Sequence, residues 1–252
     1  MNKWFKYGVL VLCLPMLMQA RTLNIRGFAH VLLLDDTDQH DIFSSKTKGV
    51  EIKQDQEVID ISARSDAANN GRVNVNIHDL NIDHIALYDH AYLSGEQVGL
   101  NHLSLSIETD KKVTLTGMIG VDSIMQKGNA NTFLSWLEAS RLDLTVHSGS
   151  MTLLGAVGQL RIKQSGSSFL DAGSLLARDV WLKISDQAHV RIKPAYKFFA
   201  NLFGDAKVEA LAKAPIRSVN VLDRAAMMYQ SKPKRDFMID PNEAGALEPV
   251  LI

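Results

Sequence analysis

Short stretches of alternating apolar and polar residues recur about every twenty residues through the middle of the chain. They are Leu103–Ile107, Leu142–Val146, Leu160–Lys163 and Val180–Ile184, with Ile124 falling between the first two. From one first apolar residue to the next, the steps are 21, 18, 18 and 20 residues. Alternation with period 2 predicts strands, and the longer period predicts stacked copies of one structural unit.

A second series of strands runs beside the first one. Its leucines are Leu93, Leu115, Leu134, Leu153 and Leu170, at steps of 22, 19, 19 and 17 residues. Glycine follows two residues after three of them, at Gly95, Gly117 and Gly155. Glycine tolerates a positive φ, so we expect two strands per coil with a corner between them. The alternative is an antiparallel sandwich with regular turns, but the repeated side-chain order favours a solenoid.

Parallel stacking would place the inward residues of successive coils in aliphatic columns. One expected column consists of Leu103, Ile124, Leu142, Leu160 and Val180. Burial of each side chain stabilises the fold by roughly 1.5 to 3 kcal/mol, but only if neighbouring coils cover it. The outward residues Ser104, Asp143, Arg161 and Lys183 share no charge sign, which is typical of a solvated face.

The N-terminus has the pattern of a secretory signal peptide. Residues 1–8 include Lys3 and Lys6, residues 9–18 are apolar, and Ala20 ends the segment with a small side chain. This pattern predicts a signal peptide at 1–20 and export to the periplasm or the surface of a bacterium. The only cysteine, Cys13, lies inside it, and Leu12 before it disfavours a lipoprotein. The mature chain would therefore contain no disulfide. No later stretch is long and apolar enough for a transmembrane helix.

The rest of the chain divides into a solenoid at 21–230 and a tail at 231–252 that we expect to be disordered. Residues 21–90 resemble irregular early rungs of the same stack. Residues 196–214 have a helix-like composition suited to a short terminal cap, although Val208–Ala210 and Val219–Val221 are equally consistent with final rungs. The chain has 252 residues, 46% hydrophobic, and a net charge of −1, which indicates a folded protein and disfavours nucleic-acid binding.

Candidate ligand-binding side chains are few. Trp181 lies between the inward residues Val180 and Leu182, so it should point outward, where an aromatic ring can stack on a sugar. Tyr88 and Tyr92 are further candidates for glycan binding. Histidine and aspartate recur together between residues 78 and 90, but residues six apart in a strand are about 20 Å from each other, which disfavours a metal site. Neither a metal nor a cofactor is expected.

The segment from Ser148 to Ile192 resembles a known family. Its Ser148–Ser150 turn, the strand pairs Leu153–Gly155 and Leu160–Ile162, and the Ser165–Ser167 turn are similar to those of the "putative auto-transporter adhesin head domain", also called the GIN domain. The resemblance extends over about residues 23–225. Two departures are Trp136 in place of a corner glycine, and Ser185–Ala188 in place of a Ser-Gly turn.

The resemblance implies a right-handed parallel β-helix-like solenoid in an exported adhesin-like protein, with no catalytic residues to transfer. We therefore expect a non-enzymatic envelope or surface protein that binds glycan, extracellular matrix or another envelope component. The alternative is a β-helical polysaccharide lyase or hydrolase, which needs carboxylates or a carboxylate with cations in adjacent rungs. Asp143, Arg161 and Lys183 come nearest to that arrangement, although their phase within the rungs is unequal.

Overall fold

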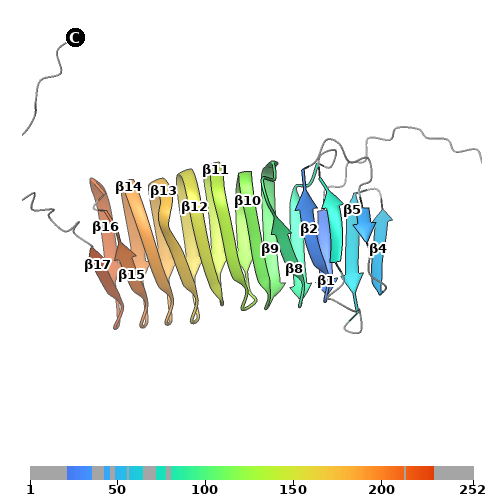
Figure 1. The fold of residues 1–252 in the computed structure, drawn as a ribbon. Coiled ribbons are helices and arrows are strands. Elements are labelled where there is room, and N and C mark those ends of the chain that lie inside the picture. The colour runs from blue at the N-terminus through green and yellow to red at the C-terminus, as the bar shows by residue number, and fades with distance from the viewer. Residues whose placement is uncertain are drawn as a thin grey trace, which may run out of the picture.

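Successive coils of the chain lie side by side along one axis and pair through parallel strands (Figure 1). The computed structural model describes residues 22–35, 43–45, 49–55, 57–64, 72–77, 81–212 and 214–229, and within them every regular element is a strand. The predicted parallel β-solenoid is therefore confirmed. The signal peptide predicted at 1–20 and the tail predicted at 231–252 lie outside the described residues.

The coils form two faces joined by a corner on one side and by turns on the other. A strand of the first face runs into the corner, and the chain returns along the second face before it turns into the next coil. In β10 to β14, one long bent strand covers both faces. The strands are β1 (Thr22–Gly27), β2 (His30–Leu34), β3 (Phe43–Ser45), β4 (Val50–Asp55), β5 (Val58–Ala63), β6 (Arg72–Asn76), β7 (His84–Asp89), β8 (Tyr92–Gly95), β9 (Leu100–Thr109), β10 (Lys112–Gln126), β11 (Asn131–Val146), β12 (Ser150–Gln164), β13 (Phe169–Ile184), β14 (His189–Leu202), β15 (Lys207–Ala210), β16 (Ile216–Val221) and β17 (Ala226–Tyr229).

The two faces follow from the strand pairing. The first half of β10 pairs with β8 and its second half with β9, and β14 likewise pairs with β15 and β16. The first face therefore contains β2, β6, β8, β15, β17 and the first halves of the long strands. The second face contains β1, β5, β7, β9, β16 and the second halves.

The dry interior is built from columns, meaning residues at the same position in successive coils. Leu142 pairs with Leu160 and Leu160 with Val180, as predicted, and all three are fully buried. In the first-face ladder, Leu134 lies between its predicted neighbours Leu115 and Leu153. Each of these side chains is covered only because the coils before and after it are in register.

The predicted column is wrong at its N-terminal end. Leu103 pairs with Val121, whereas Ile124 pairs with Leu105 and Leu144. Ile124 thus belongs to a second buried column, two residues further along the strand. The cause is an irregularity in β10, where the register to β9 shifts on both sides of Val121. Asp122 is an extra residue in β10 at this point, so the inward residues Val121 and Ile124 are three positions apart instead of two.

Chain order and spatial order differ at the N-terminal end. β1 pairs in parallel with both β5 and β7, and β2 pairs with both β6 and β8. Figure 1 shows β1 and β2 between later parts of the chain, and β4 at the outer end pairs antiparallel with β5. Strands of residues 21–90 thus form irregular early rungs, as predicted, but their order along the axis differs from their order in the chain. Alternation identifies these strands, but it does not indicate which strand each one pairs with.

The C-terminal end continues the solenoid. Residues 196–214, for which a helix-like cap was one expectation, contain the end of β14 and the whole of β15. The alternative prediction of final rungs is confirmed, because Val208 lies in β15 and Val219 in β16. The cap prediction fails because alternating burial in β14 and β15 matches a strand period rather than a helical one.

The corner requires a left-handed backbone in three successive coils. Gly117 has φ +128° and Gly155 φ +139°, and a Cβ on either would lie within 2.3 Å of a backbone oxygen in the neighbouring coil. Trp136 takes the equivalent place in β11 with φ +61°. Its large side chain fits because it points out of the corner into solvent.

The turns on the opposite side also use left-handed residues, alternately glycine and aspartate. Gly166 and Gly204 have φ +69° and +67°, while Asp186 and Asp223 have φ +63° and +58°. The Asp186 carboxylate accepts a hydrogen bond from the Gly166 N–H at 2.9 Å, and that of Asp223 accepts one from the Gly204 N–H at 3.0 Å. Aspartate thus replaces glycine and ties its turn to the preceding coil.

Two buried glutamines complete the turns from inside. Gln126 and Gln164 occupy inward positions at the ends of β10 and β12, in a column that is otherwise aliphatic there. The Gln126 amide donates to the carbonyl oxygens of Ala130 at 3.1 Å and Ser148 at 2.9 Å. The Ala130 carbonyl oxygen also accepts a hydrogen bond from the Ser150 N–H of the next coil at 3.0 Å, so the buried amide adds a second bond to the turn.

We predict that Gly166→Ala destabilises the protein more than Gly204→Ala. Both changes cost about 1 to 2 kcal/mol because the backbone is left-handed. At Gly166 the new Cβ would also lie 2.4 Å from the His147 carbonyl oxygen, whereas at Gly204 its nearest neighbours are 3.1 Å away. Urea denaturation of both variants measures the difference, and equal losses would contradict the close contact between coils at Gly166.

A second prediction concerns the turns beside β7 and β9. His90 Nδ1 lies 2.8 Å from an Asp110 carboxylate oxygen, and this hydrogen bond, followed by one from Lys111, lowers the pKa of Asp110. The contribution to stability is therefore present above the ordinary range of an aspartate and is lost as pH falls through the lowered pKa. His90→Ala should raise the Asp110 pKa, measured by NMR titration, more than Lys111→Gln does. An unchanged pKa in His90→Ala would refute the pairing.

Candidate binding face

The second face carries a group of basic and aromatic side chains in β12, β13 and β14. In one outward column Arg161 pairs with Trp181 and Trp181 with Phe199; in the next column Lys163 pairs with Lys183 and Lys183 with Asn201. These six residues, called here the Trp181 patch, line a shallow depression of about 300 Å³. The patch arises because strand alternation turns these side chains outward while their neighbours fill the interior.

Trp181 points outward, but both of its ring faces are covered. The Arg161 guanidinium lies 5.6 Å from the centroid of the Trp181 ring, and the Phe199 ring is stacked on it with a centroid distance of 6.1 Å. Arg161 and Phe199 belong to the coils on opposite sides of Trp181. A sugar ring could therefore stack on Trp181 only by displacing one of them, which limits the predicted role of this side chain.

The positive charges of the patch lack local compensation. Arg161, Lys163 and Lys183 form no ion pair with a carboxylate in the described part of the chain. The register neighbour of Arg161 is Asp143, but that carboxylate is held by Arg141, with Oδ2 2.7 Å from Nη2. The patch therefore presents net positive charge to solvent.

The residues considered for an enzyme are only partly brought together. Asp143 and Arg161 are register neighbours, whereas Lys183 pairs with Lys163 and lies two residues further along the strand. Glycosidic bond cleavage ordinarily uses two carboxyl groups. In these two outward columns, Asp143 is the single carboxylate between β10 and β14.

Tyr88 and Tyr92 lie far from the patch. Tyr88 is on the second face in β7, where Arg26 lies 4.5 Å from its ring centroid. Tyr92 is in β8 on the first face, and its ring centroid is 5.5 Å from that of His30. Five coil steps separate β7 from β13, or about 24 Å at the usual strand spacing. The three aromatic candidates therefore do not form one site.

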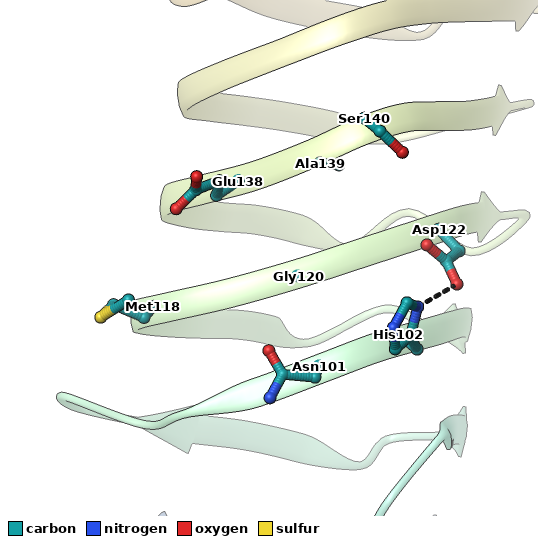
Figure 2. A pocket seen from close by; sticks show the side chains of 8 residues that line it. All are labelled: Asn101, His102, Met118, Gly120, Asp122, Glu138, Ala139 and Ser140. Atoms are coloured by element: carbon teal, nitrogen blue, oxygen red, sulfur yellow. Dashed lines mark hydrogen bonds and ion pairs between the residues drawn. The ribbon is translucent and has the colours of Figure 1, made fainter.

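A second depression, of about 240 Å³, lies near the corner in β9, β10 and β11. Figure 2 shows His102 directed toward Asp122, with 3.2 Å between Nδ1 and Oδ2. Glu138 lies at the other end of the view, apart from this pair. The depression is lined by Asn101, His102, Met118, Gly120, Asp122, Glu138, Ala139 and Ser140.

Groups of side chains able to hold a metal are absent from the described part of the chain. Of the histidine and aspartate pairs noted in the sequence, His78 and Asp79 lie outside the described residues. His90 is instead paired with Asp110 in the adjacent coil. In the same described part, no helix is long and apolar enough to cross a bilayer.

Large apolar side chains protrude along the corner edge, away from the Trp181 patch. Met118 is 70% exposed, Trp136 74% and Leu176 53%, and they come from β10, β11 and β13; Tyr196 of β14, 47% exposed, lies between this edge and Phe199. Sequence analysis did not predict this group of exposed apolar side chains, and it did not predict Phe199 or Lys163 as parts of a binding site. A usable signal existed, because residues 18 to 20 positions apart on outward strand positions become neighbours.

Three solved structures share the fold of this chain. A "putative adhesin" from Parabacteroides merdae ATCC 43184 matches with a TM-score of 0.67 and 12% sequence identity, and the match covers 84% of this chain and 92% of that one. A "putative lipid binding protein" from Parabacteroides distasonis ATCC 8503 matches with a TM-score of 0.67 and 11% identity, over 84% and 93%. A "putative adhesin" from Bacteroides fragilis NCTC 9343 has a TM-score of 0.56 and 13% identity, over 84% and 93%.

Identities this low establish the shared fold alone. A sequence comparison with curated proteins finds no match to this chain. The family model described as "putative auto-transporter adhesin, head GIN domain" matches residues 36–214. The matched stretch is more than half of the chain and includes the Trp181 patch. The chain therefore belongs to the head GIN domain family.

Proposed function

We propose that this protein is an exported, non-enzymatic binding protein of the bacterial envelope or cell surface, and that it attaches to glycan through the Trp181 patch. The observation that carries the proposal is the set of three cations, Arg161, Lys163 and Lys183, which have no carboxylate partner among the described residues and line a depression on a sheet face. Long flat faces of stacked coils suit extended ligands, because each coil repeats the same spacing of outward side chains.

Family membership and the N-terminal sequence support export. The matching family is described as an adhesin head domain, and adhesins act outside the cytoplasm. Residues 1–20 carry two lysines, an apolar stretch and a small final residue, as signal peptides do. The single carboxylate in the outward columns beside the patch supports a binding role over glycosidic cleavage.

We predict that the protein is recovered outside the cytoplasm with Arg21 as its first residue. Cell fractionation and N-terminal sequencing measure this, and protease treatment of intact cells separates surface from periplasmic location. The variant Leu10→Arg/Leu12→Arg should remain cytoplasmic because charges interrupt the apolar stretch, while Leu10→Val/Leu12→Val should be exported. Recovery of the wild-type chain in the cytoplasm with residues 1–20 attached would contradict the proposal.

We also predict that the protein does not cleave the polysaccharides it binds. Wild type and Asp143→Asn should both release no reducing ends or unsaturated products above the buffer control, because Asp143 is held by Arg141 and has no second carboxylate beside it. Cleavage by the wild type that Asp143→Asn abolishes would favour a lyase or hydrolase instead.

A further inference from the structure

The two lysines of the Trp181 patch are placed directly beside each other. Lys163 and Lys183 are register partners in the parallel strands β12 and β13, and both side chains are exposed. Neighbouring strands lie about 4.8 Å apart, and like charges at opposed positions destabilise a sheet. A bound anion would remove this repulsion, so the free protein already favours a negatively charged ligand at this point.

Arg161 is oriented for the same purpose by the aromatic stack. Its guanidinium lies over the Trp181 ring, whose other face is supported by Phe199. An arginine held on a ring keeps its N–H donors free at the edge, where they can bind a carboxylate or sulfate in a bidentate manner. The stack reduces the freedom that Arg161 loses when it binds, which favours affinity.

The positive charge of this patch is not a property of the whole chain. The whole chain has a net charge of −1, so attraction of polyanions by overall charge is excluded. Several exposed cations elsewhere are paired, as Lys127 is with Glu108 at 3.1 Å and Arg224 with Asp205 at 2.9 Å, and Arg217 in β16 lies 5.9 Å from the centroid of the Tyr229 ring. A ligand with several negative groups would therefore be directed to the patch.

The polar neighbour of the lysines favours a saccharide over a lipid surface. Asn201 extends the lysine column into β14, and its amide can exchange hydrogen bonds with hydroxyl groups. Binding to a membrane surface ordinarily combines cations with protruding apolar side chains. Here the two most exposed apolar side chains of the described residues, Trp136 at 74% and Met118 at 70%, lie at the corner instead.

We infer that the Trp181 patch binds an acidic polysaccharide lying along the solenoid axis, with its carboxylate or sulfate groups on Lys163, Lys183 and Arg161 and its hydroxyls near Asn201. The inference rests on the proposed function, which names the same face, and adds the charge of the ligand. Trp181 is a positioning residue in this arrangement, because it orients Arg161 rather than stacking on a sugar.

The test is calorimetric titration of the exported full chain with polygalacturonate, dextran sulfate, neutral dextran and phosphatidylglycerol vesicles, at low and at physiological salt. The two acidic polymers should bind, more weakly at the higher salt because charges are screened. Lys163→Gln/Lys183→Gln should weaken binding about ten-fold. The matched control Lys112→Gln/Lys207→Gln removes two exposed lysines from the first face and should leave affinity unchanged.

The positioning role of Trp181 has its own readout. Trp181→Leu should weaken binding of dextran sulfate roughly two- to five-fold by releasing Arg161, and Trp181→Phe should restore most of it because an aromatic face is retained. Equal affinity in Trp181→Leu and the wild type would remove Trp181 from the site. Circular dichroism of each variant verifies that the solenoid remains folded.

Several outcomes would overturn the inference. Binding of neutral dextran as tight as that of the acidic polymers, an unchanged affinity in Lys163→Gln/Lys183→Gln, or binding to vesicles alone would each do so. An exported protein that binds neutral glycan would keep the proposed function while losing its acidic ligand. Retention of the protein in the cytoplasm would instead overturn the proposed function, whatever the titrations give.

Discussion

Every interior coil of this protein must be in register with two neighbours at once. The backbone N–H and C=O groups of each strand are paired on both sides only when the coils before and after it align, and unpaired buried groups are costly. The same alignment covers the inward side chains, since Leu160 is buried between Leu142 and Val180. Hydrogen bonding and apolar burial are therefore satisfied together or lost together. The turns at Gly166, Asp186, Gly204 and Asp223 accordingly keep one backbone conformation, with φ between +58° and +69°.

The register of the interior also determines the chemistry of the exterior. The register that aligns inward residues also aligns the outward residues next to them in each strand. The pairing of Leu160 with Val180 therefore places Arg161, Trp181 and Phe199 in one row. A shift of one residue in any coil would separate the row and expose the core. Binding residues on such a face need no loop to position them. Their spacing is set by the distance between strands, which suits ligands with a regular repeat.

The strand content, the parallel stacking and the left-handed corners at Gly117 and Gly155 could be predicted from the sequence because they follow from alternation and from glycine. The exact register could not, because the step of three residues from Val121 to Ile124 does not by itself show which strand carries the extra residue or which column Ile124 joins. The position of β1 and β2 between later coils was also inaccessible, since strands with similar alternation can pair in several orders. The turn at Asp186 appeared as a departure, yet it keeps the turn conformation because the aspartate accepts the left-handed backbone.

The candidate site was predicted only in part. The outward direction of Trp181 followed from its place between Val180 and Leu182, but the covering of its ring by Arg161 and Phe199 depends on contacts twenty and eighteen residues away. Superposing the sequence on itself by one coil would have revealed the neighbouring lysines, since Lys163 and Lys183 differ by one repeat. Tyr88 was considered with Trp181 because of its residue type, and distance along the solenoid separates the two.

The place of β1 and β2 in the stack has a consequence for the order in which the chain can fold. These strands are made first, yet the partners on their two sides, β5 with β6 and β7 with β8, end only at Gly95. Pairings between segments this far apart in sequence form slowly, because the intervening chain must first be closed into a loop. A nascent polypeptide therefore cannot assemble coil by coil from its beginning. The N-terminal strands gain both neighbours only once the chain as far as Gly95 is available, whereas β11 to β14 can each be added to the coil before it.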